Sequence, residues 1–516
     1  MARYKDYDYT QGKFIPIHFD KQIIPGTFEH TLHYLINNEI DLSIFDLRYR
    51  NDETGAPAYD PAILLKIILY AYARGITSSR KIERCCKENV VFMALSADTQ
   101  PHFTTIADFI STASEEIIRL FLEVLMVCDE MNLIGKEMFA IDGCKMPSNA
   151  SKEWSGTKAE LRKKKKKMEK AVRQIIGRHK QMDANEANRE MIDQEAKYVE
   201  TMRTKIKKIQ RWLKENDDKP GKTGKPVKSN ITDNESAKMK TSKGVIQGYD
   251  GVTVVDDKHQ VIVHAEAFGK AQEHDLLKPM VEGTRENFKE ISSEEDIFES
   301  VKLVADSGFH KEENMKMLME EGIDGYVADP HFRKRDPRFS EADRYKERTR
   351  KERHERDGTK SIYGLDKFTF AEDLSHCICP AGKRMYRSGN NVIISGKQAM
   401  RFRGNKSNCR SCSLRTECIR TPEKTETRQV AYFKGTGKDG KETYTQKMKR
   451  KIDSIKGRLI YNRRLGTSEP PFAHIRSILR LDRFSLRGKK KVNTQWLLYC
   501  IVHNLLKVHR YGEVFA

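Results

Sequence analysis

Apolar positions in the first quarter of the chain recur at the spacing of short helices. An apolar run over residues 62–73 follows Pro61, a residue type favoured at the start of a helix. Further along, Thr112 and Glu115 have the spacing of a capping box ahead of another apolar stretch. Short helices joined by tight turns are typical of helix-turn-helix domains and equally of ordinary helical bundles. We therefore predict a helical domain over residues 1–130.

A heptad pattern dominates residues 161–213. Apolar side chains repeat there three and four positions apart, in two seams. The seams are Leu161, Met168, Val172 and Ile175, and Val199, Met202, Ile206, Ile209 and Leu213. Such repeats form the contact seam between paired helices. The sequence therefore predicts an antiparallel helical hairpin that projects from the body of the protein.

Strand patterns lie on both sides of this hairpin. Residues 137–142 and 301–306 are short apolar runs that each end on an aspartate. Residues 249–255 and 261–268 are apolar stretches separated by a polar turn, which is typical of a β-hairpin. Strands separated by helices and large interruptions predict an α/β fold with a mixed sheet flanked by helices.

The charge of the chain is strongly basic and unevenly distributed. Its 516 residues include 95 Lys and Arg against 74 Asp and Glu, a net charge of +21. Residues 161–230 hold 22 basic and 10 acidic side chains, residues 441–516 hold 18 and 5, and the other 370 residues sum to −4. A basic excess favours an anionic polymer as partner, with nucleic acid first, although a charge run can also be a merely solvated face.

Several classes of protein are disfavoured by what the sequence lacks. There is no run of about 18 apolar residues, so we expect no membrane span. The first residues lack the apolar core of a signal peptide, so we expect a cytoplasmic protein. No Gly-Lys-Ser/Thr phosphate-binding motif supports an ATP-driven helicase, and no Ser or Cys nucleophile motif supports a hydrolase triad.

Three acids are distinguished by their settings. Asp142 and Asp306 each end an apolar run and precede small residues, and Glu469 lies in the basic C-terminal segment. An acid at a strand end can simply form a turn or cap a helix, and Glu469 can pair with Arg464 or Arg476. The functional alternative is a Mg²⁺ site, because Mg²⁺ takes a few carboxylates together with water and phosphate oxygens. Two such ions support in-line displacement at phosphorus.

These acids lie in segments that resemble the signature regions of a known family. The segments are Ala140-Ile-Asp142-Gly-Cys-Lys145, Val304-Ala-Asp306-Ser-Gly-Phe-His310, and Tyr461 to Arg476 with Glu469-Pro-Pro-Phe472. Their order and spacing are similar to those of bacterial insertion-sequence transposases of the DDE class. The closest branch has a helical N-terminal domain and a cysteine-containing insertion before the Glu. The resemblance covers most of the chain, except residues 1–20 and the helical hairpin.

The resemblance implies an RNase H-like core with Asp142, Asp306 and Glu469 as its metal-binding triad. It implies an enzyme that uses Mg²⁺ or Mn²⁺ to cut transposon ends and to join 3′-hydroxyls to target DNA. The partner is then double-stranded DNA, both terminal inverted repeats and target. We expect a homodimer in the active complex, because two ends must be handled together. Such a protein would be associated with the bacterial nucleoid.

Further site residues follow from the same resemblance. Tyr461, Arg464 and Arg476 stand where the family keeps residues that contact the end DNA. Two positions depart from the family pattern: Asp250 stands where relatives usually show Asn, and Ser468 where an aliphatic residue is usual. Neither is a triad position, and they leave open whether this copy is active. Two alternatives remain: a non-catalytic DNA-binding regulator derived from a transposase, and a metal-dependent nuclease without strand transfer.

We predict six segments from these patterns. They are a helical N-terminal DNA-binding domain at 1–130, core parts at 131–155, 230–330 and 447–516, the basic helical-hairpin insertion at 156–229, and a charged and cysteine-rich insertion at 331–446.

Half of the ten cysteines cluster in that last insertion. They are Cys377, Cys379, Cys409, Cys412 and Cys418. Without a secretory signal, metal binding is a better interpretation than a disulfide framework. Zinc takes four S or N ligands in a tetrahedron, and close cysteine pairs supply them. We predict a structural Zn²⁺ held by four of the five, with the choice of four left open, and incidental reduced thiols as the alternative.

The basic side chains suggest two further DNA contacts. Lys163, Lys164 and Lys165 begin the densest basic run, where they can hold DNA phosphates or be merely solvated. We assign sequence reading to the N-terminal helices, where Arg80 and Lys81 can face a groove.

Overall fold

A computed structural model gives the structure of the protein. It describes residues 10, 16–49, 57–179, 186–221, 224, 226–242, 244–292, 296–336, 362–395, 397–437 and 440–512. The chain divides into two compact units. The first comprises residues 1–302 and 463–516, and the second comprises residues 303–462.

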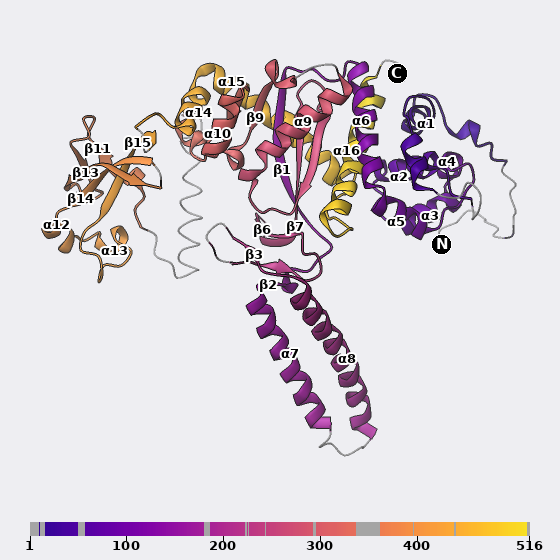
Figure 1. Ribbon diagram of the computed structural model, residues 1–516, viewed down its shortest axis with the longest axis horizontal. Helices are drawn as coiled ribbons and strands as arrows, with labels where there is room; N and C mark the ends of the chain where they lie inside the picture. The colour runs from indigo at the N-terminus through magenta and orange to yellow at the C-terminus, as the bar shows by residue number, and fades with distance from the viewer. Residues whose placement is uncertain are drawn as a thin grey trace, which may run out of the picture. The chain divides into compact units, whose positions relative to one another are not determined.

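Short helices form the N-terminal part of the first unit (Figure 1). They are α1 (Phe28–Asn38), α2 (Pro61–Ala73), α3 (Ser79–Glu88), α4 (Val90–Leu95), α5 (Phe103–Thr112) and α6 (Ser114–Glu130). Helix α2 begins at Pro61 as predicted, and the Asp60 side chain caps it by accepting a hydrogen bond from a first-turn amide. The predicted capping box is wrong. Helix α6 begins at Ser114 without a side-chain cap, because the Thr112 hydroxyl donates instead to the Asp108 carbonyl.

An antiparallel sheet forms the centre of the first unit. Its strands are β1 (Met138–Pro147), β6 (Ala237–Thr241), β7 (Gly244–Asp256) and β8 (Ile262–Phe268), and the helices that cover it are α9 (Leu277–Ile291) and α16 (Lys489–Tyr511). The predicted hairpin of β7 and β8 is confirmed. The prediction that Asp142 ends a strand is wrong. Strand β1 continues past Asp142, which pairs with Thr253 in the middle of the β1–β7 ladder.

The two covering helices lie on opposite faces of this sheet. Neighbouring residues of β1 point to opposite faces. On one face, the Phe139 ring stacks on Phe288 of α9 with centroids 5.5 Å apart. On the other face, Trp496 of α16 lies so close to Gly251 that an added Cβ would be 3.0 Å from the indole. The register pairs Gly251 with an even-numbered residue of β1, so Asp142 faces the side of α16.

Helices α7 (Lys158–His179) and α8 (Glu186–Glu215) form the predicted antiparallel hairpin, which extends away from the sheet (Figure 1). The predicted seams are confirmed: all but one of their residues are buried in a single apolar cluster, and Leu213 packs against it half-buried. Trp212 is buried in the same cluster. The hairpin is therefore held together by its own apolar seam, which leaves its basic side chains on the outside.

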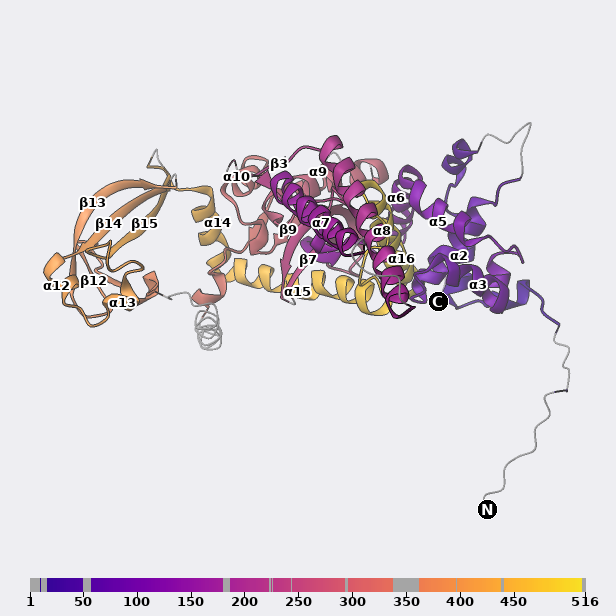
Figure 2. The ribbon, with the colours of Figure 1, turned by 90° about the horizontal axis from the view of Figure 1, so that it is seen from below.

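The second unit contains a small parallel pair and a separate antiparallel sheet. Strands β9 (Lys302–Ala305) and β10 (Gly325–Val327) are parallel, with α10 (Glu312–Glu320) between them in the chain. The antiparallel sheet carries the cysteine-rich segment, and Figure 2 shows its longer strands side by side. Its strands are β11 (Thr369–Phe370), β12 (His376–Ile378), β13 (Arg384–Ile394), β14 (Lys397–Gly404) and β15 (Gln429–Gly437). The charged part of the predicted insertion includes residues 337–361, which lie outside the described residues.

The segment that carries Glu469 is not one continuous α-helix. Helix α14 (Tyr444–Asp453) is followed by α15 (Ile455–Ala473) and a π-helical turn at His474–Ile478. Pro470 lies inside α15 and has no N–H, so the carbonyl of Gly466 loses its helical donor. The side-chain amide of Gln260 donates to that carbonyl instead, at 3.1 Å. Within the described residues, no helix has both the length and the apolar character needed to cross a bilayer.

Candidate active site and cysteine cluster

The carboxylate of Asp142 is held by its own strand and by helix α15. Its Oδ1 accepts a hydrogen bond from the amide of Gly143 at 2.8 Å. Its Oδ2 accepts from the guanidinium of Arg464 at 2.7 Å and from the hydroxyl of Ser468 at 3.0 Å. The side chains of Arg464 and Asp142 are 8% and 19% exposed. Asp142 therefore takes part in a largely buried ion pair.

Helix periodicity explains which residues of α15 reach Asp142. Arg464 and Ser468 are four residues apart and lie on the same face of the helix. The next residue, Glu469, is turned away from that face and is exposed. The structure therefore brings Arg464 and Ser468, rather than Glu469, into contact with Asp142. No pairing of Glu469 with Arg464 or Arg476 is seen among the described residues.

Asp306 directly follows β9 in the second unit, as the sequence predicts. Its side chain accepts a hydrogen bond from the amide of Gly308 at 2.7 Å and caps the short 3₁₀ turn Ser307–Phe309. It is half-buried. This is the turn-capping geometry that is the alternative to a metal-binding role for Asp306.

The donor set of the predicted triad suits a hard cation, because carboxylate oxygens are the ligands that Mg²⁺ prefers. Among the described residues, no three Asp, Glu, His or Cys side chains are gathered closely enough to hold a metal ion. The triad with its Mg²⁺ or Mn²⁺, and the zinc site expected among the cysteines, therefore stay predictions.

A second group of buried charges lies on the other face of the sheet. Asp250 pairs with Lys145 in the β1–β7 register, so it points to the face of α9, away from Asp142. It is fully buried, and an added Cβ on Gly143 would lie 2.9 Å from its Oδ1. Lys145 donates to Glu273 at 2.6 Å. Burial first, and the neighbouring Glu273 carboxylate second, raise the pKa of Asp250 to about 8. The sequence singled out Asp250 only as a departure from relatives.

The other residues expected at the DNA have varied settings. Tyr461 is half-buried, and its ring meets Phe332 edge-on with centroids 4.9 Å apart. Arg476 is exposed and lies near Cys144, where it partly offsets the burial that raises the pKa of that thiol. Arg464 is buried against Asp142, as described above. Of these three side chains, only that of Arg476 is exposed and so accessible to DNA.

The predicted N-terminal contacts lie on α3, where both side chains are exposed. The guanidinium of Arg80 lies 4.7 Å from the ring centroid of Phe103, a cation–π contact, and Lys81 is the next residue. The exposure of these two side chains does not by itself test a contact to DNA, so both contacts stay predictions.

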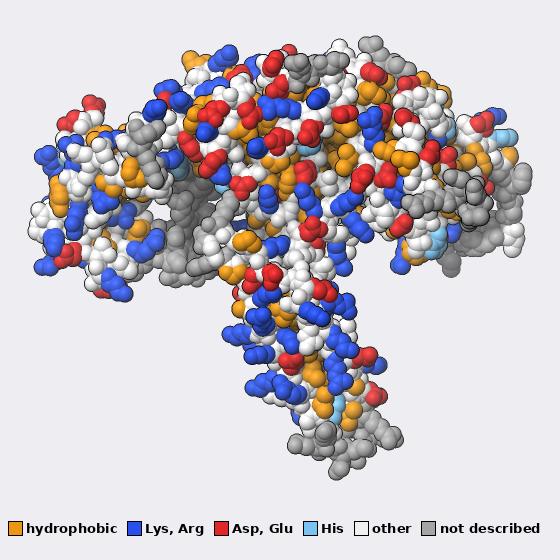
Figure 3. Space-filling view, viewed as in Figure 1, with side chains coloured by type: hydrophobic (Ala, Val, Ile, Leu, Met, Phe, Trp, Pro, Cys, Tyr) orange, Lys and Arg blue, Asp and Glu red, His pale blue; other side chains and the backbone are white. Residues whose placement is uncertain are grey.

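The three lysines at the start of the hairpin differ in role. Lys163 is exposed. The ammonium of Lys164 donates to the carbonyl of Glu153 at 2.6 Å and lies 4.2 Å from the ring centroid of Trp154. Lys165 is half-buried and pairs with Glu169, one turn along the helix, at 3.4 Å. Lys164 therefore anchors the base of the hairpin, and Lys163 remains available to a phosphate. Figure 3 shows Lys and Arg side chains along the outside of both helices.

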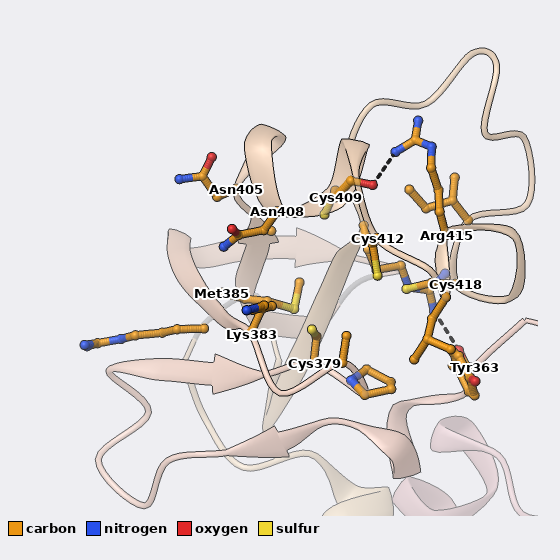
Figure 4. A pocket seen from close by; sticks show the side chains of 17 residues that line it. Tyr363, Cys379, Lys383, Met385, Asn405, Asn408, Cys409, Cys412, Arg415 and Cys418 are labelled. Atoms are coloured by element: carbon orange, nitrogen blue, oxygen red, sulfur yellow. Dashed lines mark hydrogen bonds between the residues drawn. The ribbon is translucent and has the colours of Figure 1, made fainter.

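Four of the five clustered cysteines line one cavity of the second unit: Cys379, Cys409, Cys412 and Cys418. Their sulfurs face the same space in Figure 4. Gly404 leaves room for the Cys409 sulfur, which would lie 2.7 Å from an added Cβ. Burial raises the pKa of Cys418, the charge of Arg428 lowers it, and the three other thiols raise it.

Cys377 is separate from this group. It is fully buried in the apolar core of the sheet together with Met385, Phe402 and Val430. Its burial raises its pKa to about 11, so it stays a neutral thiol. The structure thus separates Cys377 from the other four, a choice that the spacing of the cysteines left open.

Two protein-family models match the chain. A model described as "Transposase DDE domain" matches residues 378–509, and one described as "Transposase domain (DUF772)" matches residues 17–112. The chain belongs to the insertion-sequence transposases of the DDE class. No curated protein matches it. The transposase is therefore an enzyme that acts on DNA.

The matched ranges include some of the predicted site residues of the transposase and not others. The DDE-domain match includes Glu469 and the four cysteines that line the cavity. The N-terminal match includes Arg80 and Lys81. Asp142 and Asp306 lie outside both matches, so their roles rest on the signature segments that surround them.

Proposed function

We propose that this transposase cuts transposon ends and joins the freed 3′-hydroxyls to target DNA, with Asp142, Asp306 and Glu469 as the carboxylates that hold its divalent cations. The observation that carries the proposal is the position of Asp142. It lies within a sheet strand, and its carboxylate accepts a hydrogen bond from Arg464 of helix α15, which also carries Glu469. One polar helix therefore contacts the first acid of the triad and supplies the last.

The proposed chemistry needs a cation and these carboxylates together. Mg²⁺ or Mn²⁺, when bound, would activate the attacking oxygen and stabilise the leaving oxygen of an in-line displacement. The chain supplies the negative charges that hold the cation and, near them, Arg464. We infer that Arg464 neutralises Asp142, because a largely buried carboxylate without a partner is costly.

DNA is proposed to meet the transposase at its basic surfaces. The exposed lysines of the hairpin, Lys163 among them, would contact phosphates without reading sequence, and α3 would read sequence through Arg80 and Lys81. A homodimer is proposed as the active form in the cytoplasm, since two transposon ends are cut and joined together.

The function is tested with purified protein and a DNA that carries the inverted repeats flanking its gene. With Mg²⁺ or Mn²⁺ the protein is expected to nick the repeat ends and to join them to a target plasmid, and EDTA is expected to stop both steps. Cutting without joining would identify a nuclease and contradict strand transfer. Binding without cutting would identify a regulator and contradict the proposed chemistry altogether.

A structural zinc is proposed for the second unit, bound by Cys379, Cys409, Cys412 and Cys418. Four thiols that line one cavity are the donor set that a closed zinc site needs. The proposal excludes Cys377, which lies in the apolar core. Such a site would stabilise the cysteine-rich sheet without taking part in catalysis. Zinc content of the purified protein tests it.

A further inference from the structure

A basic groove runs between the end of helix α15 and the last turns of helix α16. Gln260, Pro470, His474, Lys507 and Arg510 line it, all within the first unit. Pro470 directly follows Glu469 in the sequence. The groove therefore begins beside the residue proposed to complete the catalytic triad, and the function proposed above does not use it.

Two cations of this groove have no acidic counter-ion among the residues that the structure describes. Lys507 and Arg510 are three residues apart, so they share one face of α16. The ammonium of Lys507 donates to the side-chain carbonyl of Gln260 at 3.1 Å. Among the described residues, neither Lys507 nor Arg510 has a carboxylate within 4 Å. Burial lowers the pKa of Lys507, and the charge of Arg510 lowers it further. The pair therefore carries positive charge that nothing on the described surface neutralises.

The floor of the groove is neutral and held in place by hydrogen bonds. The Nε2 of His503 lies 2.9 Å from the carbonyl of Gln260, which can only accept, so His503 donates there. The Nδ1 atoms of His503 and His474 are 2.9 Å apart, so His474 donates to His503. Burial lowers the pKa of His503 to about 3, which keeps it neutral. Gln260 is fixed in turn by its bond to Gly466. No charge in this chain of contacts offsets Lys507 and Arg510.

We propose that this groove binds a backbone phosphate of duplex DNA and guides the strand past Glu469. A phosphodiester supplies the negative charge that the two cations lack, and Lys or Arg contacts of this kind fix the register of DNA without reading its sequence. The inference deepens the proposed function, because it names where the DNA of that reaction lies on the first unit. The charge distribution predicts DNA contacts over the basic C-terminal segment in general, but Lys507 and Arg510 are not among the individual DNA contacts that the sequence predicts.

The test is the salt dependence of DNA binding by the full-length protein. A fluorescently labelled duplex of about two helical turns is titrated by anisotropy at several NaCl concentrations, for the parent and for Lys507→Gln and Arg510→Gln. Each lost phosphate contact is expected to reduce the slope of log K against log[NaCl] by about 0.9 and to weaken binding about three- to tenfold. Lys507→Arg, which keeps the charge, is expected to keep the parent slope. Lys289→Gln, the same charge change at an exposed position of α9, serves as the matched control.

Slopes of Lys507→Gln and Arg510→Gln that equal those of the parent or of Lys289→Gln would overturn the inference. So would a parent protein that does not bind the duplex at 50 mM NaCl. A variant that unfolds is recognised by its circular dichroism spectrum, and the slope of the other Gln variant then decides the question. Failure of the proposed catalysis is detected separately, because Asp142→Asn is scored by cutting and joining and these variants are scored by binding.

Discussion

The guanidinium of Arg464 lies 2.7 Å from the carboxylate of Asp142, although the two residues are 322 positions apart in the sequence. The contact joins a central strand of the sheet to helix α15, and Ser468 completes it through the same carboxylate oxygen. Arg464 belongs to the segment that suggested contacts to DNA. In the structure its guanidinium is instead the counter-ion of the first proposed triad acid. Cation binding at Asp142 must therefore replace or share this arginine.

Removing Arg464 is expected to destabilise the protein. Arg464→Met would leave Asp142 partly buried without its counter-ion, at a cost of about 1–3 kcal/mol in the free energy of unfolding. The measurement is the urea midpoint of Arg464→Met, Asp142→Asn and the double variant. A coupling energy of about 1 kcal/mol or more between the two sites is expected. Arg476→Met, at an exposed arginine further along the same segment, is the control and should stay within about 0.5 kcal/mol of the parent. A coupling near zero would contradict the ion pair.

Asp250 predicts a dependence of stability on pH. Burial first, and Glu273 second, raise the pKa of Asp250 to about 8, whereas an unfolded aspartate titrates near 3.8. Between these values the unfolded chain loses a proton that the folded chain keeps, so stability falls as pH rises from about 4 to about 8. Asp250→Asn removes this titration and can donate a hydrogen bond to Glu273. We expect parent and variant to be similar at pH 4 and the variant to become increasingly more stable than the parent as pH rises to 8. A stability difference that does not change with pH would rule out this titration.

Lysines one residue apart on the hairpin are expected to differ in effect. Lys164→Gln breaks the contacts to Glu153 and Trp154, so it should destabilise the hairpin by about 1 kcal/mol and speed its proteolysis. Lys163→Gln removes an exposed charge, so it should leave stability within about 0.5 kcal/mol of the parent while weakening DNA binding. Limited proteolysis and anisotropy measure the two effects. Equal results for the two variants would contradict the assignment of Lys164 as an anchor.

The cysteine cluster predicts which thiol is dispensable for zinc. The purified protein is expected to hold about one zinc per chain, and Cys418→Ser to lose most of it. Cys377→Ser should keep the zinc, because Cys377 lies in the core of the sheet and not at the cavity. Metal content by mass spectrometry and the melting temperature after chelation provide the readouts. Loss of zinc in Cys377→Ser with retention in Cys418→Ser would reverse the assignment.

Local patterns in the sequence predicted the elements whose conformation is set by residues close together in the chain. The α2 helix, the apolar seams of α7 and α8, and the β7–β8 hairpin follow from periodicity and turn residues, and the structure confirms them. The capping box at Thr112 and Glu115 failed because the hydroxyl of Thr112 bonds back within its own helix. A Thr and a Glu at the spacing of a capping box thus did not determine to which backbone group the Thr hydroxyl donates.

Other features depend on contacts between distant segments, which spacing cannot supply. Asp142 was expected to end its strand because the apolar run stops there, yet pairing with β7 carries the strand through Gly143 to Pro147. The partnership of Asp142 and Arg464 joins segments from opposite ends of the first unit. Cys377 could not be told from its neighbours until strand pairing placed it in the core. The sequence thus supplies candidate acids as predictions, but not the side chains that contact them.

Strand transfer by Asp142→Asn, compared with Asp250→Asn, tests the central claim most directly. Both substitutions replace a buried or partly buried aspartate on paired strands of one sheet, and the two side chains point to opposite faces. With Mg²⁺ and DNA carrying the terminal repeats, we expect Asp142→Asn to bind DNA like the parent and to neither cut nor join it. Asp250→Asn should cut and join like the parent. Cutting and joining by Asp142→Asn at the parent rate would contradict the assignment of Asp142 to the catalytic triad.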